Sequence, residues 1–258
     1  MELDLSAVLR TAMAEPSTLW HWSPNCSPWS TMKMNKTNAF DSGHCSMDMT
    51  FDILRNVAEE QPVTLLIENV PLFFTSDIYK MLSLRMRRWG YREYSGIHDA
   101  GDFGGHTGRK RFYGFFTSLP GDFSFEPQST QKVKLWTVVE KHLNECRDVT
   151  HSKALQDGKN LGLLRTITPQ TQVCPTITRS QSRMAKDSLV IDFNDRLYFP
   201  SEELLKELQG LPASLKLDAV GYEQAVEIIG QSVDGPMHAA LLQAIKIHIE
   251  TSASQLIQ

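Results

Sequence analysis

Apolar positions in the first half of the chain alternate between short continuous runs and stretches with helical spacing. Residues 18–23 are rich in aromatic and apolar side chains, and residues 63–67 form a continuous apolar run, as is typical of strands buried in a sheet. Residues 52–60 and 76–86 repeat apolar side chains every three or four positions, which predicts helices. A further run at 112–116 predicts another strand. The pattern therefore predicts strands and helices in alternation.

This alternation implies an α/β fold in which helices cross over between parallel strands in a right-handed sense. Ligands of such sheets bind beyond the carboxyl ends of the strands. Cys26 follows the first predicted strand, and the sequence Glu68-Asn69-Val70 follows the second. We therefore expect both to lie at the functional edge of the sheet.

The second half of the chain is less regular. From about residue 119 to 158 the sequence is polar, apart from a predicted short helix at 136–143. Helices are predicted again at 201–208 and 236–249, the second of them amphipathic. These shifts divide the chain into three parts, 1–118, 119–164 and 165–258.

Composition narrows the class of protein. The chain has 258 residues, of which 41% are hydrophobic, enough for a sizeable core. It contains no apolar stretch of about 18 residues and no signal-peptide pattern at its start, so we expect a soluble protein, cytoplasmic or nuclear, without a membrane partner. Its four cysteines have neither zinc-site nor disulfide-framework spacing, and no metal site is predicted.

Charge is unevenly distributed along the chain. A net charge of −4 argues against an indiscriminate nucleic-acid binder. Residues 80–111, however, hold eight basic and three acidic side chains. This local excess could face phosphates or could form a solvated helix face, and charge alone leaves both interpretations open.

Four short motifs carry the candidate chemistry, and their order and spacing are more specific than any one of them. They are PNCSPWS at 24–30, ENVP at 68–71, FGGHTGRKR at 103–111 and IGQSV at 229–233. In this combination the chain resembles the DNA cytosine-5 methyltransferases. That family has a Pro-Pro-Cys-Gln-Pro-Phe-Ser-like loop, then Glu-Asn-Val, Gln-x-Arg-x-Arg, a variable recognition region and Gly-Asn-Ser-Val.

The resemblance implies a Rossmann-like S-adenosylmethionine-dependent methyltransferase fold and a covalent mechanism on a cytosine flipped out of double-stranded DNA. Cys26 would attack C6 of the base, and Glu68 would donate to N3. Arg111 would contact O2, and Arg109 would orient the loop or meet a phosphate. The loop 27–45 would close over the base. Residues 1–118 would then be catalytic, 119–164 a small target-recognition region and 165–258 a segment returning to the catalytic domain.

The resemblance also implies S-adenosylmethionine as cofactor, held by Asp4, Pro24, Asn25, Gln231, Ser232 and Val233. The family's N-terminal glycine-rich motif and the acidic residue that grips the cofactor ribose are not found. We therefore expect a fold that is incomplete at its N-terminus, with a partner subunit supplying these motifs, a truncated chain or a decayed copy. Thr107 replaces the usual Gln of the third motif, and Gln231 the usual Asn of the last.

Two other functions remain open from the sequence. The chain could be a non-catalytic DNA- or protein-binding relative that keeps the fold without holding the cofactor. It could also methylate cytosine in tRNA, because the tRNA-acting branch of the family keeps the same motifs.

Overall fold

The computed structural model describes residues 18–26, 29, 45–127 and 134–256. The chain forms two compact units, which are described separately below. Unit 1 is assembled from residues 1–98, 110–124 and 244–258, and unit 2 from residues 99–109 and 125–243. Neither unit is continuous in sequence, so residues that are distant along the chain meet within each one.

Unit 1 is built on a four-stranded sheet with the order β1-β2-β4-β3. The strands are β1 (Leu19–Trp22), β2 (Thr64–Asn69), β3 (Arg92–Asp99, whose last residue belongs to unit 2) and β4 (Lys110–Thr117). β2 pairs in parallel with β1 and antiparallel with β4. All six residues of β2 are buried, as expected for a strand with neighbours on both sides and covered faces.

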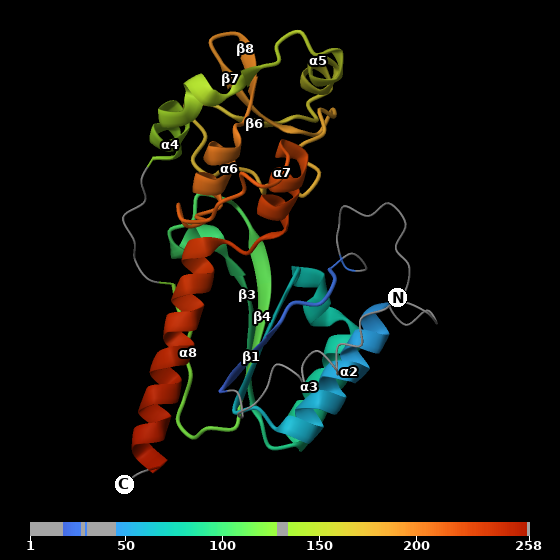
Figure 1. Ribbon diagram of the computed structural model, residues 1–258, viewed down its shortest axis with the longest axis vertical. Helices are drawn as coiled ribbons and strands as arrows, with labels where there is room; N and C mark the ends of the chain where they lie inside the picture. The colour runs from blue at the N-terminus through green and yellow to red at the C-terminus, as the bar shows by residue number, and fades with distance from the viewer. Residues whose placement is uncertain (1–17, 27–28, 30–44, 128–133, 257–258) are drawn as a thin grey trace. The chain divides into compact units, whose positions relative to one another are not determined.

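Helices α2 (Cys45–Glu60) and α3 (Asp77–Arg88) cover one face of this sheet (Figure 1). The Ser76 side chain accepts a hydrogen bond from the Tyr79 amide and caps α3 at its start. A 3₁₀ turn, η2 (Pro71–Thr75), joins β2 to α3. The core on this face contains large side chains from strands, helices and turn, including Trp20, Trp22, Ile53, Val57, Leu65, Ile67, Phe73, Leu82, Met86, Phe112 and Phe116.

The other face of the sheet meets the C-terminal part of helix α8 (Gly235–Leu256; Figure 1). His248 on that helix lies 3.1 Å from the Thr117 hydroxyl, and its ring meets Phe115 edge-on. Ser252 donates a hydrogen bond to the carbonyl of Pro120. These contacts join the end of the chain to β4 and the segment that follows it.

Unit 2 contains a second four-stranded sheet, with the order β5-β8-β7-β6. The strands are β5 (Arg147–Asp148), β6 (Arg165–Ile167), β7 (Leu189–Phe193) and β8 (Arg196–Phe199). β7 and β8 form a hairpin whose two turn residues, Asn194 and Asp195, both have positive φ. Asn and Asp tolerate that backbone conformation better than other non-glycine residues, so the sequence suits the tight turn.

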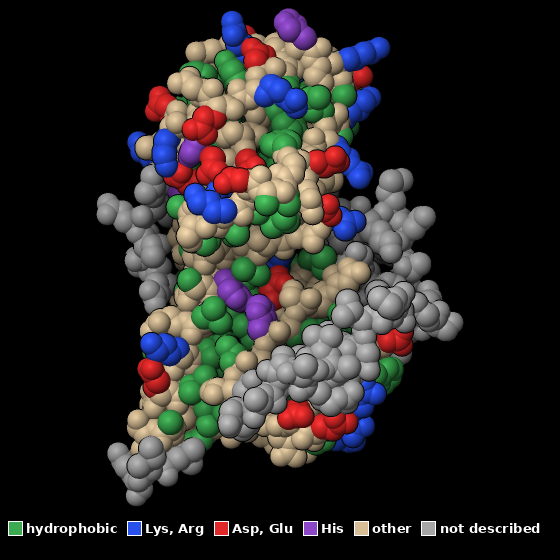
Figure 2. Space-filling model, viewed as in Figure 1, with side chains coloured by type: hydrophobic (Ala, Val, Ile, Leu, Met, Phe, Trp, Pro, Cys, Tyr) green, Lys and Arg blue, Asp and Glu red, His purple; other side chains and the backbone are tan. Residues whose placement is uncertain are grey.

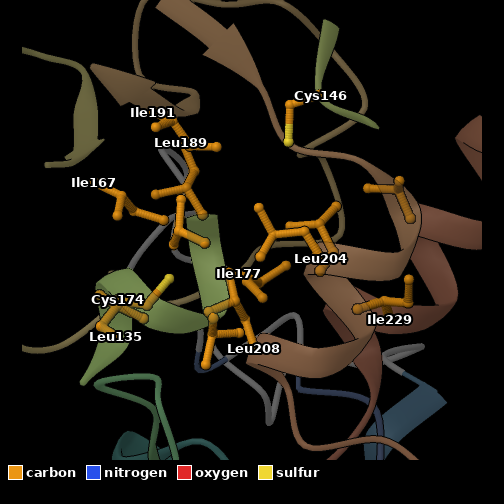
Figure 3. Close-up of a cluster of buried hydrophobic side chains, with 14 of the residues drawn as sticks. Leu135, Cys146, Ile167, Cys174, Ile177, Leu189, Ile191, Leu204, Leu208 and Ile229 are labelled. Carbon is orange, nitrogen blue, oxygen red and sulfur yellow. The ribbon is translucent and has the colours of Figure 1, made fainter. Parts of the chain in front are cut away.

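The rest of unit 2 contains helices and short turns. They are α4 (Leu135–His142), α5 (Lys153–Asn160), α6 (Glu202–Leu208), α7 (Tyr222–Gln231), η3 (Ala100–Phe103) and η4 (Leu143–Glu145). Figure 3 shows the core that they share with the strands, which includes Ile191 of β7, Leu204 of α6 and Ile229 of α7. The free thiols of Cys146 and Cys174 lie in the same apolar cluster.

Charged side chains of both signs cover unit 2. On the face that Figure 2 shows, basic and acidic groups are interspersed, and ion pairs of the unit include Lys141 with Glu207 and Lys159 with Asp192. Among the described residues, no helix is long and apolar enough to cross a bilayer. Nor do any three His, Cys, Asp or Glu side chains in that part of the chain form a group that could hold a metal ion.

Most of the predicted elements are confirmed. The runs at 18–23, 63–67 and 112–116 fall on β1, β2 and β4, and the helical patterns fall on α2, α3, α4, α6 and α8. The sheet of unit 1 is mixed rather than wholly parallel, because β4 runs antiparallel to β2. Strand β3 and the sheet of unit 2 were not predicted. The division at 118 and 164 stays a prediction.

Candidate active site

One face of the unit 1 sheet carries the candidate catalytic side chains. Ile67 on β2 points into the core beneath α2 and α3. Side chains alternate along a strand, so the next residue, Glu68, points to the opposite face. Glu68 pairs with Tyr113 on β4, and Arg111, two residues before Tyr113, lies on the same face. The residue beside Glu68 on that face is Ser23, which directly follows β1. It comes one position after Trp22, just as Glu68 comes one position after Ile67, the partner of Trp22.

Both carboxylate oxygens of Glu68 have hydrogen-bonding partners. Arg111 Nε lies 3.0 Å from Oε1, and the Ser23 hydroxyl donates to Oε2 at 2.5 Å. Glu68 is only 7% exposed, and the Arg111 side chain is also largely buried. An ion pair with this little solvent contact is screened less than a surface pair, and its hydrogen bonds are charge-assisted. The arrangement fixes the Glu68 carboxyl from two sides.

The segment that bears Cys26 is attached to β2 and to the core. Asn69, directly after Glu68, donates from its side-chain amide to the carbonyl of Pro24 at 2.9 Å. The Trp29 amide donates to the carbonyl of Cys26, and the buried Trp29 ring meets Phe73 edge-on at 4.7 Å. Cys26 itself is a free, exposed cysteine. Its segment is therefore anchored on both sides while its side chain remains accessible.

His21 also faces Glu68, and sequence reasoning did not select it. It precedes Ser23 by two residues on β1, so both point to the face opposite the Trp20 and Trp22 core. Burial lowers the pKa of His21, and the nearby Glu68 carboxylate opposes that shift. Alternation along 18–23 could have indicated both His21 and Ser23, since two polar residues alternate there with two tryptophans.

Arg109 lies in unit 2, apart from the set around Glu68. It is 2% exposed, and its guanidinium donates to the backbone carbonyls of Ile177, Gly230 and Ser232 at 3.2, 3.2 and 2.6 Å. Ile177 lies outside the four motifs, whereas Gly230 and Ser232 belong to the IGQSV motif. The predicted role of Arg109, to orient the loop or to meet a phosphate, stays a prediction.

A buried carboxylate of unit 2, that of Asp234, lies near these contacts. Asp234 follows the IGQSV motif, accepts from the Thr107 hydroxyl at 3.3 Å and accepts from the Met237 amide in the first turn of α8. Gly105 permits this approach, because a Cβ there would lie 2.8 Å from the Asp234 carboxylate. Burial raises the pKa of Asp234, against the opposing effects of these hydrogen bonds and of the Arg109 charge.

The motif residues predicted to hold a cofactor have contacts within unit 2. Gln231 donates to Glu227, and the Ser232 hydroxyl donates to the carbonyl of Ile229. A Cβ at Gly230 would lie 2.4 Å from the backbone at Thr178, so close packing accounts for that glycine. The predicted cofactor contacts of Gln231 and Ser232 stay predictions.

The remaining predicted site residues are placed as follows. Asp4 lies outside the described residues, as does nearly all of the predicted lid at 27–45. Pro24 is buried, Asn25 is exposed and Val233 is half-buried. The structure thus joins Glu68 to Arg111 and to the Cys26 segment within unit 1, and joins Arg109 to the last motif within unit 2.

Comparison with known proteins identifies the family. The model of the C-5 cytosine-specific DNA methylases matches residues 21–173, more than half of the chain and including three of the four motifs. The chain belongs to this family. The match begins on β1, two residues before the Ser23 that contacts Glu68.

A bacterial methyltransferase is similar in sequence to most of this chain. The Type II methyltransferase M.BsuFI of Bacillus subtilis is 27% identical over 247 residues, which is 90% of this chain and 58% of that protein. The chain thus spans less than two thirds of this relative's length.

Solved methyltransferase structures share the fold. The Dnmt2 methyltransferase of S. pombe superposes with a TM-score of 0.72 at 19% identity, covering 87% of this chain and 77% of that one. The Entamoeba histolytica methyltransferase EhMeth gives a TM-score of 0.71 at 16% identity, covering 88% and 76%. The chain therefore has the α/β methyltransferase fold, and both family and fold imply the use of S-adenosylmethionine.

Proposed function

We propose that this chain transfers a methyl group from S-adenosylmethionine to C5 of a cytosine in DNA, through a covalent bond between Cys26 and C6 of the base. The observation that carries the proposal is the fixed Ser23–Glu68–Arg111 set, joined by the Asn69 bond to the segment that bears an exposed thiol. Family membership supports the same reaction class.

The sulfur of Cys26 would act as the nucleophile. C5 of cytosine is a weak nucleophile, and addition of a thiolate at C6 turns C5 into an enamine carbon. After C5 takes the methyl group, its proton leaves to a base. The C6–S bond then breaks, and its electron pair returns to sulfur. In sum, the S–C6 and C5–methyl bonds would form. The donor's sulfonium–methyl bond, the C5–H bond and the C6–S bond would break, which leaves S-adenosylhomocysteine, a proton on the accepting base and the free Cys26 thiolate.

Glu68 and Arg111 would stabilise the charge that addition places on the base. The negative charge spreads over N3 and O2 of the ring, so a donor is needed at each position. Glu68 would hold a proton toward N3, and the guanidinium of Arg111 would face O2. Because both groups are preorganised and largely buried, they need little rearrangement when the charge develops.

S-adenosylmethionine, when bound, supplies an electrophilic methyl group. In this chain Pro24, Asn25 and the backbone of residues 231–233 would hold it, and Asp4 would contribute as the resemblance implies. The target base would have to leave the duplex, because its C6 is inaccessible in the stack.

The test is covalent trapping, which does not require the cofactor. The full chain is incubated with a pool of duplexes that carry pyrimidin-2-one, a base that accepts a thiolate at C6, within random flanking sequence. We expect a denaturation-resistant adduct that mass spectrometry locates on Cys26. Cys26→Ala should give none, whereas Cys146→Ala, which removes a buried thiol of unit 2, should react like wild type.

Three results would contradict the proposal. An adduct in Cys26→Ala would mean that another residue is the nucleophile. Absence of adduct in the wild type with every duplex would favour the non-catalytic binding relative. Adduct formation only with the same base in a tRNA stem-loop would move the activity to RNA.

A further inference from the structure

We propose that Ser23 is a positioning residue for Glu68, holding its carboxyl in the orientation in which it meets the target base. The inference rests on the proposed function and concerns the same site. It assigns a role to a residue outside the four motifs, which begin one position later at Pro24.

The hydrogen bond itself belongs to a strong class. Ser23 Oγ lies 2.5 Å from Glu68 Oε2, at the short end of the range for hydroxyl donors to carboxylates, where hydrogen bonds are about twice as strong as neutral ones. Glu68 is buried and has few solvent molecules to replace a lost partner. The Ser23 bond therefore contributes more to the orientation of the carboxyl than an exposed bond would.

A second anchor is needed because of the geometry of the glutamate side chain. The terminal torsion of Glu is broad, so a carboxyl held at one oxygen can still rotate. Arg111 Nε holds Oε1, and Ser23 holds Oε2 from the neighbouring strand. With both oxygens held from different strands, the plane of the carboxyl is fixed.

The position of Ser23 also connects the acid to the nucleophile. Ser23 directly follows β1, and Cys26 comes three residues later in the same segment. The adjacent bond from Asn69 to the Pro24 carbonyl holds the backbone of this segment to β2. Ser23 adds a side-chain contact, so a shift of the Cys26 segment would also shift the carboxyl of Glu68.

Among the described residues, Glu68 also has charged or titratable neighbours. Arg111 on β4 forms an ion pair with it, and His21 faces it from β1. The Ser23 hydroxyl is the donor to Oε2, and Arg111 is bound to Oε1. Loss of the Ser23 hydroxyl should thus free that oxygen while the Arg111 pair remains.

The experiment compares three hydroxyl variants in the trapping reaction with pyrimidin-2-one duplex. Ser23→Ala should lower the rate constant of adduct formation at saturating DNA by about 10-fold, the effect of one hydrogen bond to a charged group. DNA affinity and the thermal unfolding midpoint should stay near wild type. Ser23→Thr keeps the hydroxyl and should restore most of the rate.

Ser118→Ala is the matched control. Its hydroxyl donates to the carbonyl of Val63, directly before the opposite end of β2, so it removes a similar contact away from Glu68. It should react like wild type. A Ser23→Ala rate equal to wild type, an equal loss in Ser118→Ala, or a failure of Ser23→Thr to restore the rate would overturn the inference.

A second readout separates this inference from the proposed function. Carbodiimide and an amine label carboxyl groups without any DNA, and mass spectrometry reports the labelling rate of Glu68. We expect faster labelling in Ser23→Ala than in wild type, Ser23→Thr and Ser118→Ala. If the wild type forms no adduct but labelling follows this order, the proposed function fails and the Ser23 anchor stands. Equal labelling in all four proteins refutes the anchor.

Discussion

Two arginines of one motif, separated by a single residue, lie in different regions of the molecule and have different partners. Arg111 in unit 1 pairs with the Glu68 carboxylate beside the Cys26 segment. Arg109 in unit 2 donates to three backbone carbonyls. Sequence resemblance placed both among the catalytic residues. The comparison shows that a motif fixes the position of a side chain along the chain, whereas its partners decide its role.

The partners differ in their chemistry as well as their place. A carboxylate can exchange a proton and carries a full charge, so the Arg111–Glu68 pair can respond when a substrate develops charge. Backbone carbonyls neither titrate nor move independently of the fold. Arg109 therefore stabilises the segments at Ile177 and Gly230–Ser232, and its loss should be measured first as a loss of stability.

The largest effect should follow from Arg111→Lys. Lysine keeps the positive charge but lacks the planar fork that holds Glu68 Oε1 and would meet O2 of the base. We expect the rate constant of adduct formation at saturating DNA to fall by about 100-fold, the effect of removing one donor from a developing charge. Chemical denaturation should show little change in the free energy of unfolding. A variant that unfolds more easily yet reacts at the wild-type rate would reverse the assigned roles.

Arg109→Lys, the same substitution two residues earlier, should give the opposite result. An ammonium group cannot reach three carbonyls that a guanidinium spans, so about two of the three hydrogen bonds should be lost. We expect a destabilisation of about 2–4 kcal/mol, from the contribution of hydrogen bonds to charged groups. Urea titration followed by circular dichroism would measure it. Well below the unfolding transition, the adduct rate should remain within a few-fold of wild type.

A large rate loss in folded Arg109→Lys would contradict this separation. It would mean that Arg109 acts on the reaction itself, as the resemblance first suggested. The pair of identical substitutions therefore tests the comparison directly, since each variant is the control for the other.

The sequence predicted the first unit well because its signals are local. A continuous apolar run such as 63–67 and the helical spacing at 76–86 depend on near neighbours, and both predictions are confirmed. Strand β3 was missed because its residues are only partly buried and show no regular alternation. The sheet of unit 2 was missed for a related reason: β5 and β6 have two and three residues, too few for a periodic pattern.

The candidate site was predicted in part. Glu68 and Arg111 were chosen by motif, and their ion pair is present. Ser23 and Asp234 were not chosen. The importance of Ser23 depends on the register between β1 and β2, and that of Asp234 on the approach of Thr107 across 127 sequence positions. No window of sequence contains either relationship.

The smallest predicted effect concerns the pH dependence of unit 2, through Asp234. Burial raises the pKa of this carboxyl above its ordinary value of 3.8, so the folded protein binds the proton more tightly than the unfolded chain does. Its contribution to stability is therefore greatest at low pH and is lost as the pH rises from 3.8 through the raised pKa. Asp234→Asn cannot ionise, and its amide oxygen can still accept from the Met237 amide.

The stability of Asp234→Asn relative to wild type should accordingly increase with pH across that window and then level off. Urea unfolding at a series of pH values from 3.5 to 7 would measure the difference in the free energy of unfolding, with Asp102→Asn at an exposed position of the same unit as control. A difference that decreases with pH would mean that the Thr107 bond and the Arg109 charge outweigh burial. Asp234 would then stabilise unit 2 as an ionised partner of Arg109. Both arginines would be paired with a carboxylate, and the difference in their partners that separates Arg111 from Arg109 would be lost.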